Sequence, residues 1–366
     1  METNRIGRRT LLRTAGAVAA AAAVTGCGTL MGNGESRGSS GGGGKKRLVV
    51  SNSGGAYSDA LTKAIYEPFT KETGITVTTV NYQSAQVIAQ VRQGRPQVDL
   101  MDNSLLIFQK MERLECLEPV DYDRLKNVKG AGIPEVQLPQ HAVGKNVWAS
   151  VMAYRTDSLK RAPKSWADFW NPDAFPGPRS LQSADADLPE LEFALLADGV
   201  PLDKLYPLDV DRAFASMSRI RGDVKKFWNT GALPAVLLGR KEVVATSLWG
   251  GRADELIKQG QPVAYQWNGA RRMTNGWGIP KGAGNTDAAY QLIDFSLRPE
   301  VQAAFAKLSP TGGPVVPGAV KLLSDDVLAT LPTSPERLKT GFDADVAWWD
   351  KNQEAVIKRW QEWADA

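Results

Sequence analysis

The chain can be interpreted outward from residues 51–59, which read Ser51-Asn52-Ser53-Gly54-Gly55-Ala56-Tyr57-Ser58-Asp59. An apolar run at 48–50 precedes this stretch, and apolar residues recur at helical spacing between residues 61 and 69. The pattern predicts a strand, a glycine turn and a helix. Ligands of open α/β sheets lie at such turns, although a first β-α turn that binds nothing fits this stretch equally well.

The composition excludes several classes of protein. With 366 residues the chain exceeds one typical domain, so two lobes are expected. Its net charge is only +4 and no basic patch with interleaved aromatics occurs, which argues against a nucleic-acid partner. One histidine, His141, and two cysteines, Cys27 and Cys116, exclude a disulfide scaffold and most metal sites. We therefore expect neither a metal nor a cofactor.

Residues 1–27 have the layout of an export signal. Arginines within the first 13 residues precede an apolar run at 15–24, which is too short to span a membrane. Residues 7–13 resemble a twin-arginine signal, and residues 24–27 resemble a bacterial lipobox that ends at Cys27. We expect Cys27 to be lipidated. The alternative is a soluble secreted protein in which Cys27 lies inside the removed signal.

A Gly/Ser-rich segment at 28–45 predicts a flexible linker between this signal and the folded body. From residue 46 onward, apolar runs and helical patterns follow a β-α-β-α-β order, which predicts a parallel sheet with right-handed crossovers. The buried run at 98–101 places Asp102 and Ser104 at the carboxyl end of a strand, like the glycine turn. Ser104 fits a helix N-cap as well as it fits a ligand contact.

The second half of the chain adds further candidates. A strand at 147–154 suits a crossing into a second lobe, and a short strand at 275–280 suits the return. Asp187 and Glu190 lie three residues apart at the start of a helix that runs to residue 197, so both can face one side and hold an ammonium group. Acids also favour helix N-termini without any ligand. Trp249 follows another predicted strand, where it can stack on a ligand or pack in the core.

Several motifs occur in a characteristic order along the body. They are Gly54-Gly55-Ala56-Tyr57, Glu67-Pro68-Phe69-Thr70-Lys71-Glu72-Thr73-Gly74, Glu192-Phe193-Ala194-Leu195-Leu196-Ala197-Asp198-Gly199-Val200, Leu205-Tyr206-Pro207-Leu208-Asp209 and Trp277-Gly278-Ile279-Pro280. This order resembles the extracytoplasmic spermidine/putrescine-binding protein family of ABC importers. The similarity covers nearly everything from Lys45 to the C-terminus and is more specific for the family than for the ligand.

The resemblance implies an α/β, two-lobe periplasmic-binding-protein fold of type II, with parallel sheets, helices on both faces and a ligand cleft between the lobes. We assign residues 46–150 and 275–320 to lobe 1, and residues 151–274 and 321–366 to lobe 2. The resemblance also implies a monomer that closes on its ligand and delivers it to membrane permease subunits. Such a protein works in the periplasm or another extracytoplasmic space, here held to a membrane by a lipid.

The resemblance further implies a polyamine held by carboxylates at its ammonium ends and by aromatic faces along its chain. Tyr57 matches the aromatic residue of the first loop, and Ser104 matches a cleft serine of lobe 1. Asp187 and Glu190 match the acidic pair of lobe 2, and Trp249 matches its stacking tryptophan.

Two departures from the family pattern bear on the ligand. Polyamine binders carry an aromatic residue and an acid in the first loop, where this chain has Ser53, Gly54 and Gly55. They also carry an aromatic residue and an aspartate where this chain has Met273 and Asn275. Half of the expected ammonium clamp is therefore missing. An open glycine turn with free N–H groups suits a carboxylate better than an ammonium group.

We predict a small organic amine as the ligand, with a polyamine such as spermidine or putrescine first and an amino-carboxylate such as 4-aminobutyrate second. Asp102 and Asn275 complete the predicted ligand contacts. Arg271 and Arg272 would add to a preference for carboxylates, but we expect both to lie exposed at the surface.

Three other functions fit the sequence less well. A secreted hydrolase that uses Asp187 and Glu190 as an acid/base pair rests on a weak signal, because no nucleophile motif accompanies His141. Iron capture needs tyrosines clustered with acids, whereas the tyrosines here are scattered apart from Tyr57. A structural lipoprotein would not require a cleft with Trp249 and paired acids.

Overall fold

The computed structural model describes residues 47–184, 188–309 and 312–365, all of which belong to one unit that spans 45–366. The predicted signal at 1–27, with Cys27, and the linker at 28–45 lie outside the described residues, as does Asp187. Within the described residues, no helix combines the length and the apolarity that a membrane crossing needs.

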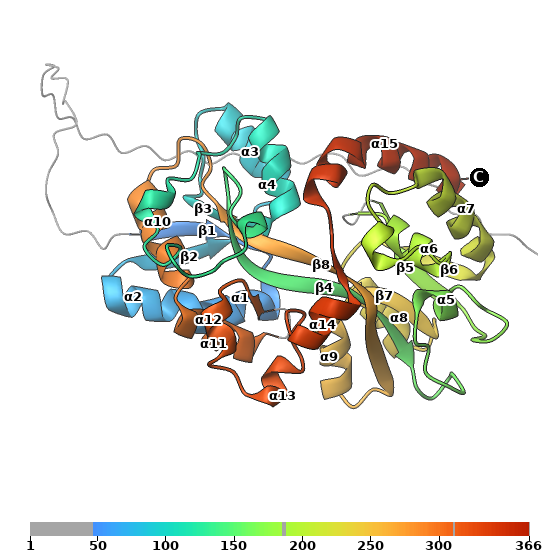
Figure 1. Cartoon of the computed structure of the whole chain (residues 1–366). Helices are drawn as coiled ribbons and strands as arrows, with labels where there is room; N and C mark the ends of the chain where they lie inside the picture. The colour runs from blue at the N-terminus through green and yellow to red at the C-terminus, as the bar shows by residue number, and fades with distance from the viewer. Residues whose placement is uncertain (1–46, 185–187, 310–311, 366) are drawn as a thin grey trace, which may run out of the picture. The chain divides into compact units, whose positions relative to one another are not determined.

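The strands of the described residues form one sheet in the order β2-β1-β3-β8-β4-β7-β5-β6, with β9 paired to β4 and β10 paired to β8 (Figure 1). Their bounds are β1 Arg47–Ser51, β2 Thr76–Val80, β3 Leu100–Ser104, β4 Val143–Arg155, β5 Arg179–Gln182, β6 Val224–Trp228, β7 Ala245–Trp249, β8 Val263–Gly278, β9 Gly313–Pro314 and β10 Phe342–Asp343.

Helices follow most of these strands. Their bounds are α1 Gly55–Leu61, α2 Glu67–Thr73, α3 Ser84–Arg92, α4 Leu105–Arg113, α5 Trp166–Phe169, α6 Leu191–Ala197, α7 Val210–Ile220, α8 Leu233–Gly239, α9 Gly250–Lys258, α10 Thr286–Ser296, α11 Pro299–Leu308, α12 Pro317–Val320, α13 Asp325–Leu328, α14 Pro335–Thr340 and α15 Val346–Asp365. A π-helical turn, Thr62–Tyr66, joins α1 to α2.

Parallel pairing occurs on both flanks of the sheet, and antiparallel pairing occurs in its middle. Strand β1 is parallel to β2 and β3, and β5 is parallel to β6 and β7. The long strands β4 and β8 pair antiparallel with each other, and they also pair antiparallel with β7 and β3 respectively. Strands β4 and β8 therefore form a two-stranded ribbon that joins the two flanks (Figure 1).

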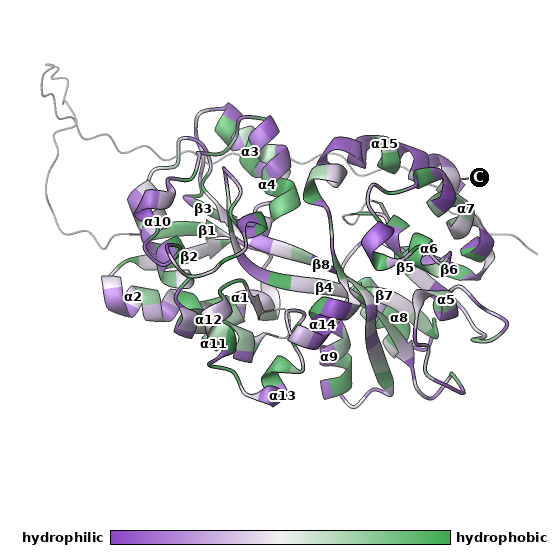
Figure 2. Ribbon diagram, in the orientation of Figure 1, coloured by the Kyte–Doolittle hydropathy of each residue, from purple (hydrophilic) through white to green (hydrophobic). Residues whose placement is uncertain are grey.

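Local sequence accounts for the helices. The buried side chains of α7 (Ala213, Phe214, Ser216, Met217 and Ile220) recur every three or four residues, as an amphipathic helix requires. Figure 2 shows the same alternation of hydrophilic and hydrophobic residues on α7 and α15. Gly74 ends α2 in the left-handed conformation, at φ 73°, as a glycine C-cap does.

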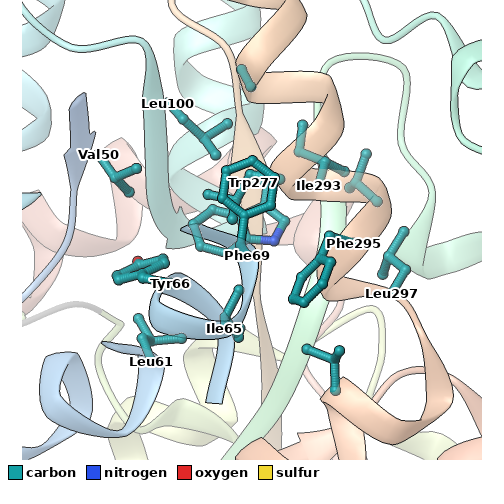
Figure 3. Packing of buried hydrophobic residues seen from close by; sticks show 14 of the residues in the cluster. Val50, Leu61, Ile65, Tyr66, Phe69, Leu100, Trp277, Ile293, Phe295 and Leu297 are labelled. Atoms are coloured by element: carbon teal, nitrogen blue, oxygen red, sulfur yellow. The ribbon is translucent and has the colours of Figure 1, made fainter. Parts of the chain in front are cut away.

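The hydrophobic core is divided between the two flanks. One cluster draws on residues 48–147 and again on residues 277–316, so the chain contributes to it twice. Figure 3 shows its packing, with Phe69, Trp277 and Phe295 among the side chains. A second large cluster is built almost entirely from residues 152–360. The lobe boundaries proposed from the sequence stay a prediction.

The strands at the crossing are longer than the sequence pattern indicated. The strand predicted at 147–154 extends over 13 residues as β4, and the short strand predicted at 275–280 is the end of the 16-residue β8. Both strands are buried on both faces over much of their length, so the alternation that marks a strand in sequence is lost.

Candidate functional site

The glycine turn lies where the sequence placed it, between β1 and α1. Gly54 and Gly55 both have positive φ values, 73° and 63°, which other residues rarely adopt. The amide oxygen of Asn52 accepts from the N–H of Gly54 at 3.0 Å, and the amide nitrogen of Asn52 donates to Ser58 Oγ at 3.1 Å. Ser53 is exposed. The turn is therefore held by its own polar side chains, and it places Tyr57 in the first turn of α1.

The hydroxyl of Tyr57 is the centre of a polar cluster that we call the tyrosine cluster: Tyr57, Asp102, Lys145, Asn146 and Asn275. Lys145 Nζ donates to Tyr57 Oη at 2.6 Å, and Asn275 Nδ2 donates to it at 3.2 Å. The hydroxyl in turn lies 3.2 Å from both Asp102 Oδ1 and Asn146 Oδ1, its two acceptors. The cluster thus combines α1, β3, β4 and β8, with Asn146 opposite Asn275 in the sheet.

Lys145 and Asp102 form a buried ion pair within this cluster. Lys145 Nζ lies 2.7 Å from Asp102 Oδ2, and the two side chains are 0% and 1% exposed. Burial lowers the pKa of Lys145 to about 8, against the opposing effect of Asp102. Burial, with Asp102 nearby, raises the pKa of Tyr57 well above its usual value. The negative charge of Asp102 is therefore already compensated by the protein.

Ser104 has a structural use. Its hydroxyl oxygen accepts from the N–H of Ile107 at 3.3 Å and so caps α4, which is the N-cap alternative that the sequence left open. Ser104 lies opposite Asn275 in the register of β3 and β8, next to the tyrosine cluster.

A second polar cluster, the glutamate cluster, consists of Gln182, Glu190, Ser247 and Trp249. Glu190 Oε2 accepts from the N–H of Gln182 and from the hydroxyl of Ser247, both at 2.8 Å. The indole N–H of Trp228 donates to Ser247 Oγ at 3.2 Å. The cluster stands at the carboxyl ends of β5 and β7 and at the start of α6, where open α/β sheets bind ligands.

Several polar atoms of the glutamate cluster lack a hydrogen-bond partner among the described residues. They are Glu190 Oε1, both amide atoms of the Gln182 side chain and the indole nitrogen of Trp249. Gln182 and Glu190 are each 1% exposed. Burial raises the pKa of Glu190 to about 7, against the opposing effect of Arg271. Buried polar groups without partners are costly, so a site of this kind calls for a bound group.

Two tryptophans connect the clusters. Trp148 donates its indole N–H to Asn275 Oδ1 at 3.0 Å, and its ring lies edge-on to that of Trp249, with 5.7 Å between centroids. Trp249 also meets Trp228 edge-on at 6.2 Å. A Cβ at Gly231 would collide with the Trp249 ring, so this position needs glycine. The contacts run without a break from Tyr57 to Glu190.

The expectation that Arg271 and Arg272 are exposed is wrong, since both are buried. Arg271 pairs with the buried Glu192 at 3.0 Å and lies 3.4 Å from the carbonyl oxygens of Leu188 and Pro189. It therefore holds the segment that leads into Glu190. Arg272 pairs with Asp343 at 2.8 Å. The acids that pair with the two arginines, and so allow their burial, are far away in the sequence. The sequence pattern around the arginines therefore did not reveal that they are buried.

The structure brings together Tyr57, Asp102 and Asn275 in one cluster and Glu190 and Trp249 in the other. Asp187 lies outside the described residues. The sequence analysis missed several residues of these clusters and of the bridge between them, namely Lys145, Asn146, Trp148, Gln182 and Ser247. Lys145 carried a usable signal, because a lysine within a strand whose other residues are largely apolar needs a partner. Gln182 and Ser247 carried none.

The sequence matches the family model described as "Bacterial extracellular solute-binding protein" over residues 64–336. It is 33% identical to the gamma-aminobutyric acid-binding protein of Pseudomonas aeruginosa over 324 residues, which are 85% of this chain and 89% of that protein. It is 26% identical to the spermidine/putrescine-binding periplasmic protein of Escherichia coli K12 over 297 residues, 78% of this chain and 84% of that one. The structure is similar to an ABC transporter substrate-binding protein from Bradyrhizobium japonicum, with a TM-score of 0.82, 32% identity, and coverage of 87% and 99%.

Proposed function

The chain belongs to the bacterial extracellular solute-binding protein family, and from this premise we propose that it captures a small amino-carboxylate, of the type of 4-aminobutyrate. The observation that carries this proposal is the set of partnerless polar atoms in the glutamate cluster. The ammonium group of the ligand would meet Glu190, and its carboxylate would meet the hydrogen-bond donors nearby.

The coarser function is established by the family. The chain is the substrate-binding protein of an ABC transporter, has the two-lobe fold of periplasmic binding proteins, and is not an enzyme. Such proteins bind a small molecule and deliver it to membrane permease subunits without converting it. The hydrolase alternative for Asp187 and Glu190 is therefore set aside.

The balance of donors and acceptors supports an amino-carboxylate. Glu190 Oε1 and Gln182 Oε1 are acceptors, which an ammonium group satisfies. Gln182 Nε2 and the indole N–H of Trp249 are donors, which need an acceptor from the ligand. A polyamine offers only N–H donors when it is protonated. An amino-carboxylate offers both kinds of group, so it can leave fewer buried polar atoms unpaired.

The tyrosine cluster supports the same ranking. A polyamine needs an acid for each of its ammonium ends, and Asp102 was the candidate in the first lobe. The ion pair with Lys145 already uses that charge. We therefore reverse the order that the sequence suggested and place the amino-carboxylate before the polyamine. The 33% identity to a gamma-aminobutyric acid-binding protein, against 26% to a spermidine/putrescine-binding one, points in the same direction.

Lobe closure, docking on the permease and export complete the proposed function. The ligand is bound when the two lobes close on it, with Ser53, Gly54, Gly55 and Tyr57 facing it from lobe 1, and the closed form docks on the permease. The chain acts as a monomer, is exported through a twin-arginine signal and is held at a membrane by a lipid on Cys27.

Thermal melting of the full chain against 4-aminobutyrate, putrescine, spermidine and a neutral sugar tests the ligand class. A ligand present at about 100 Kd adds roughly 2.7 kcal/mol of stability. We expect a shift with 4-aminobutyrate and none with the sugar. The matched control is Glu190→Gln, which keeps the shape but removes the charge and should reduce the shift. Stabilisation by putrescine or spermidine alone would contradict the proposal and restore the polyamine.

A further inference from the structure

Lys145 is surrounded as a bound alkylammonium ligand would be. Its Nζ lies 2.7 Å from Asp102 Oδ2. The side chain is 0% exposed, so solvent does not contact it. Three aromatic rings face the same nitrogen, with centroids 4.4 Å away for Trp277, 4.9 Å for Tyr57 and 5.9 Å for Phe305. We call this arrangement of Asp102, Tyr57, Trp277 and Phe305 the cation cage.

The chemistry of this cage suits a cation in general rather than lysine in particular. A carboxylate supplies the counter-charge, and aromatic faces attract a cation within about 6 Å through their quadrupoles. The cage comes from four different elements of the fold, β3, α1, β8 and α11, whereas the cation comes from β4. Burying the charge of a lysine in this way costs desolvation free energy. The ion pair with Asp102 offsets this cost only if the pair stays intact.

The cage shares one residue, Tyr57, with the route to the glutamate cluster. Tyr57, half-buried, contributes its ring to the cage and its hydroxyl to Asn275. Asn275 accepts from Trp148, whose ring meets Trp249. The contacts that start at Glu190 and run through Trp249, Trp148 and Asn275 therefore end at Tyr57, which Lys145 contacts at 2.6 Å.

We propose that Lys145 is the specificity-determining residue of this protein: its own ammonium group occupies a second cation subsite and so restricts the ligand to a single ammonium group. This inference rests on the proposed function, because it assumes that the first ammonium subsite is Glu190. Without Lys145, the same cage would accept the far end of a diamine, and the protein would become a diamine binder.

The first test removes the lysine and offers a replacement for its side chain. Lys145→Ala leaves room for propylammonium, which reproduces the lost three methylenes and the ammonium group. We expect millimolar propylammonium to raise the melting temperature of Lys145→Ala by about 2 °C or more, the scale of 1 kcal/mol for a chain of this size. Propanol should not raise it, and neither should propylammonium with wild type. The matched control, Lys145→Met, fills the space without a charge and should not respond.

The second test measures ligand choice by titration calorimetry. Wild type should bind 4-aminobutyrate and give no heat with putrescine. Lys145→Ala should gain putrescine binding by at least about tenfold, a change of roughly 1.4 kcal/mol. Lys145→Ala combined with Asp102→Asn should lose that gain, because the counter-charge of the cage is gone.

The outcomes separate the two proposals. Putrescine binding by wild type, or no rescue of Lys145→Ala by propylammonium, overturns the role of Lys145. Absence of 4-aminobutyrate binding by wild type overturns the proposed function instead, and leaves the propylammonium result to decide whether the cage exists. If Lys145→Ala does not fold, the readout is refolding in propylammonium against sodium chloride at equal ionic strength. Recovery in propylammonium alone supports the cage, and equal recovery or none in both overturns it.

Discussion

The tyrosine cluster and the glutamate cluster are both buried and both charged, yet they differ in how their polar atoms are satisfied. In the tyrosine cluster the phenol has four polar neighbours, and Asp102 Oδ2, which has no hydrogen-bond partner among the described residues, forms an ion pair with the ammonium group of Lys145 at 2.7 Å. In the glutamate cluster only one carboxylate oxygen of Glu190 has donors among the described residues. Similar residue types therefore have different roles on the two sides of Trp148 and Trp249, the tryptophans that connect the clusters.

The difference shows how to separate a structural polar network from a ligand site. A network that satisfies itself resists the loss of any member, because each deletion leaves a buried group unpaired. A network with vacant donors and acceptors depends on a ligand, and its members can be changed at little cost to the fold. Apart from the choice of ligand that we assign to Lys145, we therefore expect changes in the tyrosine cluster to affect stability and changes in the glutamate cluster to affect binding.

Asp102→Ala should have the largest effect. The substitution leaves Lys145 without a counter-charge, and breaking a buried ion pair in this way lowers the free energy of unfolding by about 3–5 kcal/mol. Denaturant titration measures this loss. The control is Asp123→Ala, which breaks the exposed pair with Lys129 and should change nothing measurable. A loss at Asp102 no larger than the control would mean that the tyrosine cluster is not a closed network.

Glu190→Gln should weaken binding of the amine ligand by about 1.5–3 kcal/mol, the range for a charged hydrogen bond. Its stability should stay close to that of wild type, because the neutral amide removes a buried charge. Titration calorimetry gives the affinity. The control is Glu242→Gln, which changes a half-exposed acid that precedes β7 in the chain. Equal affinity in wild type and Glu190→Gln would remove this carboxylate from the site.

Ligand affinity should depend on pH through Glu190. Burial raises its pKa to about 7, from the ordinary 4.5. An ammonium group needs the ionised form, so affinity should rise about tenfold between about pH 6 and about pH 8. The contribution of Glu190 to stability changes with pH in the opposite direction. The folded state holds the proton of Glu190 more tightly than the unfolded state does. The stabilising contribution of this proton is therefore full below about pH 4.5 and is lost as the pH rises through 7.

Calorimetry and denaturant titrations across this pH range measure both slopes. Glu190→Gln supplies the comparison, since it has no proton to exchange at this position and should lose the affinity slope, while its stability still varies with pH through Lys145, whose pKa is about 8. An affinity slope that persists in the variant would assign the titration to another group.

Ser104→Ala should have the smallest effect. Removing the cap of α4 costs about 1 kcal/mol of stability, and it should leave ligand affinity unchanged because the hydroxyl is already used by the N–H of Ile107. Ser104→Asp is the matched variant that restores a cap. A drop in affinity with no loss of stability would instead return Ser104 to the ligand contacts.

Much of the fold could be predicted from the sequence because its signals are local. The strand, glycine turn and helix around Gly54, the C-cap at Gly74 and the helix that ends at residue 197 all depend on neighbours in the chain. The full length of β4 and β8 could not be predicted, because strands buried on both faces lose their alternation.

The residues of the candidate site could be predicted only where a residue's chemistry is visible without its partners. The places of Tyr57, Glu190 and Trp249 follow from turns and strand ends, and all three lie in the two clusters or their bridge. The neutralisation of Asp102 could not be seen, since Lys145 lies 43 positions further on in a different strand. The burial of Arg271 and Arg272 was missed for the same reason: their carboxylate partners come from other segments.

The place of β8 in the middle of the sheet has a consequence for the order of folding events. Tyr57 and Asn275, which share a hydrogen bond, are 218 residues apart in the chain. Strand β3 cannot gain its antiparallel neighbour until most of the polypeptide has left the ribosome, and closing so long a loop is slow. The candidate site is thus assembled in the last steps of folding, after the local β-α units. An unfinished chain would expose the edges of β3 and β4 at that stage, which makes this the interval in which a chaperone matters most.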